Sequence, residues 1–253
     1  MFKQRLMSGI VLVMILTAVL YLGDMPAFLM TAIVSLVGYY ELLKVFEAEK
    51  SAIGVIGYTI SIVYYALLMV EMETFILPLS LILMIALLAV YVLRFPKYHF
   101  RQVAAGFFGF FYVSIMLSYV YQIRILEAGG IYVVLLFLGS WGNDTLAYCA
   151  GRLFGKHKMS PVLSPKKTIE GAVGGVLGAG LLGSLYSLIA RHFILTDSNL
   201  SLVFAIICMV GALLSVIGDL AASAIKRNYD IKDYGTLIPG HGGILDRFDS
   251  VIF

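Results

Sequence analysis

Charge and cysteine are the two features that this chain has least of. Only 13% of its 253 residues are charged, against about a quarter in soluble domains, so the composition excludes an ordinary soluble fold. The two cysteines, Cys149 and Cys208, lie in apolar runs without the spacing of metal ligands, and we interpret them as buried small hydrophobic residues. The net charge of +3 is too small to indicate nucleic acid as a partner.

Apolar residues take the place of the missing charge. They make up 61% of the chain, and the mean hydropathy is +0.96. Long apolar runs without strand-like alternation indicate an all-α, polytopic membrane protein. Eight runs are long enough to span a bilayer, namely Leu6–Leu22, Ala27–Leu43, Ile53–Val70, Phe75–Leu93, Val103–Tyr121, Ile131–Ala150, Gly171–Ala190 and Leu200–Leu220. A further apolar run begins after Ser250, where we expect a ninth helix to start.

The first apolar run is expected to stay in the mature protein. Lys3 and Arg5 precede it, as in a signal peptide, but no cleavage site of small residues follows it. With eight spans, every Lys and Arg except Arg124 and Arg191 falls on the same side of the membrane as the N-terminus. The positive-inside rule places that side in the cytoplasm. We therefore expect a multi-pass protein of the cell (inner) membrane with its active site facing the cytoplasm.

The polar residues of the chain are concentrated in its second half. We treat 1–253 as one membrane domain, in which 1–130 supply packing and lipid access and 131–253 form the catalytic half. The two most polar segments are Arg152–Ile169 and the segment after Leu220. Both fall on the expected cytoplasmic side, so they are able to contribute to a single site.

Asp144 lies within the sixth apolar run, in the sequence W-G-N-D-T-L-A-Y. A carboxylate inside a span is costly, and such residues usually mark a functional site. The alternative is a structural carboxylate paired with a neighbouring Lys or Arg.

A second polar feature follows the last run. Ser215, Asp219, Ser223 and Lys226 recur at helical spacing, and they form one polar stripe if the helix continues past Leu220. The stripe then indicates a polar cavity that reaches into the bilayer, and the alternative is a simple ion pair.

The segment Ser164–Gly171 reads S-P-K-K-T-I-E-G, and Thr168 lies near the start of the seventh span. Lys166, Lys167 and the N–H groups of that helix form a candidate cradle for a phosphate group. Ordinary positive-inside charge is the alternative. The seventh span then carries pairs of glycines four residues apart, which favour close helix packing and would permit a homodimer.

The last polar segment combines a turn with a pair of carboxylates. Pro239 to Gly243 is rich in glycine and includes His241. Asp246 and Asp249 follow at i and i+3, on one face if the segment is helical. Such a pair suits a divalent cation that holds substrate phosphates, and the alternative is a solvated charged face.

With these residues in view, the chain resembles the phosphatidate cytidylyltransferase, or CDP-diacylglycerol synthase, family. The family signature is carried by Ser223, Lys226, Arg227, Lys232, Asp233, His241, Gly242, Gly243, Asp246, Arg247 and Asp249. The S-P-K-K-T-I-E-G and N-D-T-L-A-Y segments also resemble the family, so the similarity covers at least Gly139–Phe253. Asn143 and Leu146 depart from the residues usual there, which we interpret as local packing variation.

The resemblance implies that CTP and phosphatidate, a membrane lipid, react to give CDP-diacylglycerol and pyrophosphate. The lipid phosphate would attack the α-phosphorus of CTP with the help of a metal ion. The implied catalytic residues are Asp246, Lys226 and Arg247. The implied substrate contacts are Lys166, Lys167, Ser223, Arg227 and His241. The implied ligands of Mg²⁺, in a centre of one or two cations, are Asp144, Asp219, Asp246 and Asp249.

Two other functions compete with this one. A CTP-dependent lipid kinase would use similar substrates and phosphate contacts. A cation-coupled membrane transporter would also explain Asp144 and Asp219 in helices. Transporters commonly have repeated halves, whereas this chain has no visible internal repeat.

Overall fold

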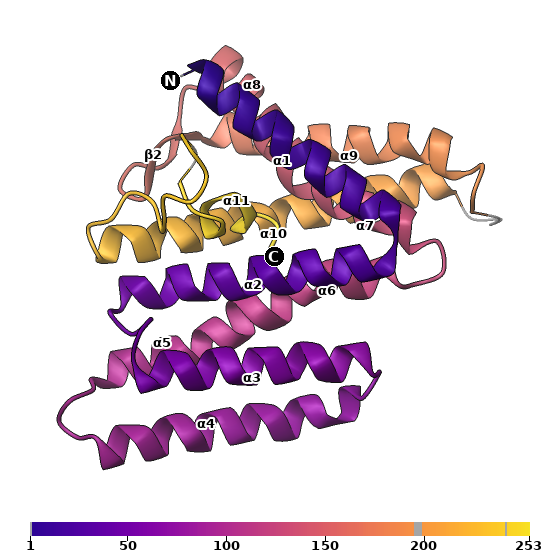
Figure 1. Ribbon diagram of the computed structural model, residues 1–253. Helices are drawn as coiled ribbons and strands as arrows, with labels where there is room; N and C mark the ends of the chain where they lie inside the picture. Colours follow the sequence, from indigo (N-terminus) through magenta and orange to yellow (C-terminus); the bar gives the residue numbers. More distant parts are fainter. Residues whose placement is uncertain (1, 195–198, 241) are drawn as a thin grey trace. The chain divides into compact units, whose positions relative to one another are not determined.

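The computed structural model describes residues 2–194, 199–240 and 242–253, and most of them are helical (Figure 1). Every segment that hydropathy predicted as a span is helical. The first four correspond to α1 (Phe2–Leu22), α2 (Asp24–Val45), α3 (Ala52–Met69) and α4 (Ile76–Leu93), the last preceded by the short η1 (Glu73–Phe75). The final two correspond to α9 (Ile169–Ala190) and α10 (Leu200–Asn228). Residues 251–253, where a ninth helix was expected to start, form a turn and irregular structure.

The fifth and sixth predicted spans contain π-helical turns that hydropathy did not predict. The fifth consists of α5 (Phe100–Gly109), η2 (Phe110–Ile115) and α6 (Met116–Arg124). The sixth consists of α7 (Gly129–Phe137), η3 (Leu138–Gly142) and α8 (Asn143–Phe154). A π-turn shifts the faces of the helix on either side of it and often lies at a functional site. Here η3 ends immediately before Asn143 and Asp144.

Six helical segments in the described part of the chain are long and apolar enough to cross a membrane. The first and the sixth predicted spans are absent from this set, and the sixth is the one that carries Asn143 and Asp144. Apolar side chains such as Val55, Ile62 and Ile85 are exposed, as expected on a surface that meets lipid rather than water. The protein is therefore a polytopic helical membrane protein.

The chain forms two compact units, which we describe separately. The first comprises Met1–Tyr121 and Asp233–Asp246, and the second comprises Gln122–Lys232 and Arg247–Phe253. The short helix α11 (Leu245–Phe248) contains the division between them.

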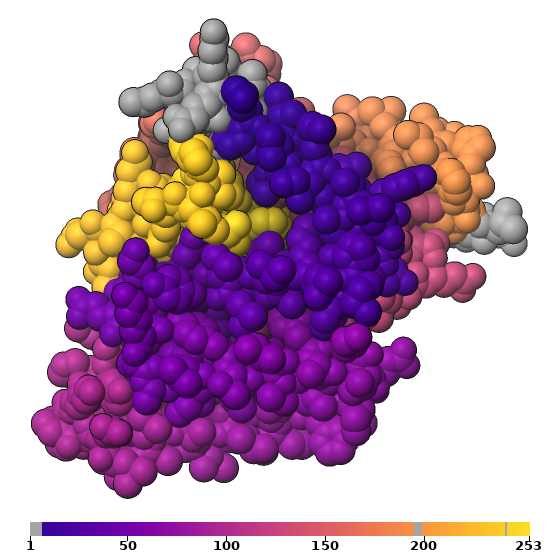
Figure 2. Space-filling view, in the orientation of Figure 1, coloured from indigo at the N-terminus to yellow at the C-terminus, as the bar shows by residue number. Residues whose placement is uncertain are grey.

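The first unit packs around Tyr39 of α2. Its side chain is fully buried, and Gly57 and Gly109 leave room for its ring, since a Cβ on either glycine would collide with it. A buried hydrogen bond of 2.8 Å joins the hydroxyls of Ser61 and Ser114, the kind of polar contact that holds helices together in lipid. The space-filling view shows a continuous face over α2, α3 and α4 (Figure 2).

The second unit packs α9 against both α8 and α10. The predicted glycine pairs of α9 serve this packing, because Gly171, Gly174, Gly175 and Gly178 all approach residues of α8. The second unit also contains an apolar cluster. Its buried members are Leu135, Ala179, Ala190, Phe204, Cys208 and Ala212. The interpretation of Cys208 as a buried hydrophobic residue is confirmed, whereas Cys149 is exposed.

The segment before α9 is a hairpin rather than a simple loop. Strand β1 (Lys158–Ser160) pairs antiparallel with β2 (Ser164–Thr168), and Lys158 lies opposite Thr168. The predicted position of Thr168 at the start of the helix is confirmed. Its hydroxyl caps α9 by accepting a hydrogen bond of 3.1 Å from the Gly171 N–H.

Replacing Gly175 with alanine should destabilise the protein by about 1–3 kcal/mol, the usual cost of overpacking. An added Cβ would collide with the side-chain oxygen of Asn143 and would lie 2.8 Å from the Cβ of Ala147. Gly211→Ala is the matched control, because its Cβ would meet only the Cα of Gly139, at 3.9 Å. Thermal unfolding in one detergent measures both variants, and equal melting temperatures would contradict the packing described for α8 and α9.

Candidate active site

The polar stripe predicted on the last span is present. Helix α10 continues past Leu220 to Asn228, so Ser215, Asp219 and Lys226 lie on one face, within about three turns of each other. Ser215 and Lys226 are buried, and about a quarter of the Asp219 side chain is exposed. The stripe therefore carries a carboxylate and a cation on the inner face of a helix that is otherwise apolar.

The hairpin supplies a second cation to this stripe. Side chains alternate along β2, so Lys166 points to solvent and Lys167 points inward. The ammonium group of Lys167 donates to the Asp219 carboxylate. Burial lowers the pKa of Lys167, and the nearby carboxylates of Asp144 and Asp249 act in the opposite direction. Three carboxylates thus lie around one ammonium group.

Asp144 joins this cluster from α8, directly after the π-turn η3. Its carboxylate accepts a hydrogen bond from the Ser250 hydroxyl, and Lys167 and Arg247 act on it electrostatically. Part of the surface of Asp144 nevertheless stays exposed, so a ligand can reach it. Asp144 has cationic neighbours, as a structural carboxylate would, and it remains accessible, as a functional carboxylate must. Both interpretations of Asp144 are therefore supported.

The C-terminal residues of the second unit are fixed beside α10. The indole N–H of Trp141 donates to the Arg247 carbonyl at 3.2 Å, and the rings of Trp141 and Phe248 lie 5.9 Å apart. Gly218 lets the backbone approach closely, since a Cβ there would lie 2.8 Å from the Asp249 carbonyl oxygen. The sequence alone did not point to Trp141 or Gly218, although each is near a predicted site residue.

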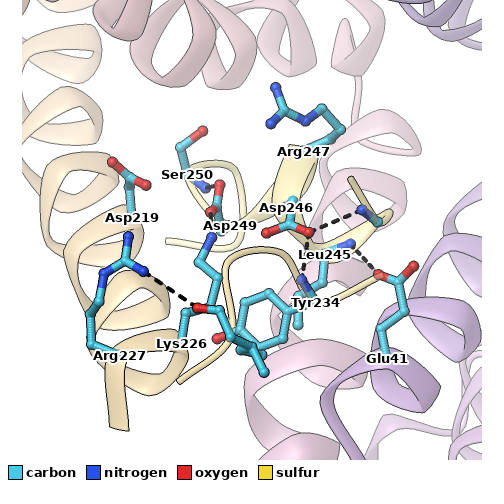
Figure 3. A network of polar contacts seen from close by, with 12 residues as sticks. Glu41, Asp219, Lys226, Arg227, Tyr234, Leu245, Asp246, Arg247, Asp249 and Ser250 are labelled. Atoms are coloured by element: carbon cyan, nitrogen blue, oxygen red, sulfur yellow. Dashed lines mark hydrogen bonds and ion pairs between the residues drawn. The ribbon is translucent and has the colours of Figure 1, made fainter. Parts of the chain in front are cut away.

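This anchoring brings Asp249 to Lys226 (Figure 3). The Lys226 ammonium lies 3.8 Å from the Asp249 carboxylate, and each side chain is only about 10% exposed. Removing one partner of such a pair leaves a buried charge without compensation, which is usually strongly destabilising. The pair therefore holds the C-terminal segment against α10 and keeps both charges in place.

The resulting cluster is balanced in charge. Its carboxylates are Asp144, Asp219 and Asp249, and its cations are Lys167, Lys226 and Arg247. The buried Nε of Arg247 has no hydrogen-bond partner among the described residues. We call this set the acid–lysine centre. A bound phosphate group would give the cations of this centre a new partner. The carboxylates of the centre would then be able to bind another cation.

A second polar cluster lies in the first unit, around Asp246. Its carboxylate Oδ2 accepts hydrogen bonds from the N–H groups of Tyr234, at 2.7 Å, and Gly243, at 3.0 Å. The Glu41 carboxylate in turn accepts from the N–H groups of Ile244, at 3.0 Å, and Leu245, at 2.8 Å (Figure 3). These bonds fix the segment that leads into Arg247.

The structural role of Glu41 was missed by sequence analysis. The only signal was a carboxylate near the end of a predicted span, which is a position that usually needs an explanation.

The other predicted site residues lie elsewhere. Lys166 and Arg227 are exposed, and the Arg227 guanidinium donates to the Ile231 carbonyl at 3.4 Å. Ser223 is half-buried on α10, and His241 lies outside the described residues. Within the described ranges, no three His, Cys, Asp or Glu side chains are close enough to form a ready-made metal site.

The fold and the acid–lysine centre together define a helical membrane protein with a polar centre built from its second half. The model of the cytidylyltransferase family matches residues 3–253. The chain therefore belongs to the cytidylyltransferase family, and it is an enzyme of that family.

Curated relatives agree with this assignment. A phosphatidate cytidylyltransferase of Bacillus subtilis is 30% identical over 263 residues, covering 99% of this chain and 94% of the relative. Those of Staphylococcus saprophyticus and Staphylococcus haemolyticus are 34% and 35% identical, and each alignment covers 99% of this chain and 95% of the relative. The similarity thus includes the first unit, for which the sequence offered mainly hydropathy.

Proposed function

We propose that this enzyme transfers the cytidylyl group of CTP to phosphatidate, giving CDP-diacylglycerol and pyrophosphate. The observation that carries the proposal is the acid–lysine centre, in a chain whose relatives are named for this reaction. The distribution of Lys and Arg supports a cytoplasmic N-terminus and an active site at the cytoplasmic face of the cell membrane.

The chemistry needs positioning and charge stabilisation more than a strong base. The attacking oxygen of phosphatidate is already anionic, so its deprotonation is not required. The enzyme must bring two polyanions together and stabilise charge on the departing pyrophosphate. Lys167, Lys226 and Arg247 supply cations for this task. The hydrogen bond of 3.2 Å from the Trp141 indole to the Arg247 carbonyl, within the second unit, supports this role for Arg247.

The donor set of the centre fits a hard divalent cation. Mg²⁺ is usually bound by one or two carboxylates together with substrate phosphates, so a preformed cage of three ligands is not needed. We propose that Asp219, with Asp144 and Asp249, holds Mg²⁺. The bound ion would neutralise phosphate charge. Lys167, once released from Asp219, would contact a phosphate of CTP. That Asp246 also binds the metal stays a prediction. The presence of a second cation in the centre likewise stays a prediction.

Labelled CTP tests this function against its rivals. Purified full-length protein in detergent is given phosphatidate, Mg²⁺ and CTP labelled at either the α- or the γ-phosphate. We expect the α-label in the lipid fraction and the γ-label in pyrophosphate. Incorporation of the γ-label into lipid would instead identify a CTP-dependent kinase. Absence of both labels from lipid would leave the transporter as the better reading and contradict the proposal.

A further inference from the structure

The first unit carries a polar pocket that the proposed reaction does not use. Its volume is about 750 Å³, and it lies where the α2–α3 and α4–α5 connections meet. Figure 1 shows both connections at the same end of these helices, which is one membrane interface of the unit. Four cationic side chains line the pocket, namely Lys44, Lys50, Arg94 and Lys97.

The pocket has an excess of positive charge that the protein does not neutralise. The four cations face only two lining carboxylates, Glu47 and Glu49. None of the four forms a salt bridge in the described part of the chain. The N-terminus of α3, capped by Ser51, also lines the pocket, and its partial positive charge adds to that of the side chains.

The walls of the pocket are held in place by hydrogen bonds between the two connections. The Gln102 side-chain amide donates to the carbonyls of Phe46, at 3.1 Å, and Glu47, at 3.2 Å. The N–H of Ala52 donates to the hydroxyl of the buried Tyr98 at 3.3 Å. These bonds tie α5 and the α4–α5 connection to the α2–α3 connection. The cations therefore surround a formed cavity and are not scattered along mobile surface loops.

We propose that this pocket binds the phosphate of an anionic phospholipid that is not the substrate. A phosphate ester matches the excess charge, and basic pockets between helices at a membrane interface commonly bind lipid head groups. The same helices offer a place for an acyl chain. An apolar groove of about 490 Å³ on α4, α5 and η2 is lined by residues that include Leu87, Phe100 and Val103. A soluble phosphate ester would make no use of this groove.

Native mass spectrometry of the full-length protein in detergent tests the proposal. Phosphatidylglycerol is the probe, since it lacks the phosphate monoester that the proposed reaction requires. Phosphatidylcholine serves as the lipid without net charge and glycerol 3-phosphate as the soluble phosphate. We expect bound phosphatidylglycerol well in excess of either. We take a Lys or Arg that contacts the lipid phosphate in the pocket to contribute about a fivefold factor in affinity, the size typical of a cation beside anionic lipid. Arg94→Gln should therefore weaken binding about fivefold and Lys44→Gln/Arg94→Gln about 30-fold.

Arg101→Gln is the matched control. Arg101 is an exposed cation on the first turn of α5, at the same end of the unit, but it does not line the pocket. Its variant should bind phosphatidylglycerol as the wild type does. Equal losses in Arg94→Gln and Arg101→Gln would mean only a general effect of charge and would overturn the site. Equal binding of phosphatidylcholine, or of glycerol 3-phosphate, would overturn the choice of an anionic lipid. None of these outcomes depends on turnover of CTP.

Discussion

Replacing Asp219 with asparagine should lower the rate of CDP-diacylglycerol formation about 1,000-fold. The change keeps the shape of the side chain and removes the charge that pairs with Lys167. It also removes the carboxylate that we propose as a ligand of Mg²⁺. Losing one preorganised electrostatic contact of this kind typically costs a factor of about 10²–10³. The measurement is the transfer of α-label from CTP to lipid at saturating substrate.

The matched control for this variant is Asp230→Asn. Asp230 is exposed in the turn after α10, and its φ of 51° is a conformation that asparagine adopts well. It loses the same charge in the same half of the chain, so its activity should stay within about twofold of the wild type. Full activity of Asp219→Asn, or an equal loss in both variants, would remove Asp219 from the proposed mechanism.

The second large effect is expected from Asp246→Asn, for a different reason. Asp246 is buried, and its Oδ2 accepts from two backbone N–H groups. Asparagine keeps an oxygen acceptor but loses the charge that strengthens both bonds. Amide hydrogen exchange at Tyr234 and Gly243 should accelerate about 10- to 100-fold, as for the loss of a charged hydrogen bond. Arg247 follows directly in the chain, and a misplacement of about 1 Å can cost about 100-fold in rate.

Measuring amide hydrogen exchange and turnover of the Asp246→Asn variant together distinguishes a positioning role of Asp246 from a direct role in catalysis. Loss of turnover with faster exchange at Tyr234 and Gly243 would support the positioning role. Loss of turnover with unchanged exchange would instead favour the sequence-based prediction that Asp246 binds metal. Glu73→Gln provides the control, because Glu73 is an exposed carboxylate in η1 of the same unit. It should change neither exchange at these amides nor turnover.

Each of the eight apolar runs that hydropathy picked out is helical, because bilayer thickness sets the length of apolar run that a spanning helix needs, and six of the described helical segments are long and apolar enough to cross a membrane. It could not predict η2 and η3, since a π-turn changes the hydrogen-bond register without changing composition. The hairpin of β1 and β2 was missed for a similar reason. Its five-residue strand carries Pro165 and two lysines, which resemble an ordinary charged loop.

The acid–lysine centre was partly predictable. The alternation of loops placed Lys167, Asp219 and Asp249 on one side, and the cost of an intramembrane carboxylate drew attention to Asp144. The sequence could not tell which lysine of the pair at 166 and 167 faces inward, because that depends on strand register. It also gave no reason to expect that Glu41 would fix the segment before Asp246, since the two lie some 200 residues apart.

We propose that the acid–lysine centre transfers a cytidylyl group with the help of a divalent cation. The most direct test of this proposal measures pyrophosphate and α-labelled lipid in the same reaction, first with Mg²⁺ and then after removal of Mg²⁺ with EDTA. The account predicts that the two products form in equal amounts, that EDTA abolishes both, and that added Mg²⁺ restores both. Formation of labelled lipid at an undiminished rate in EDTA, or without matching pyrophosphate, would contradict it.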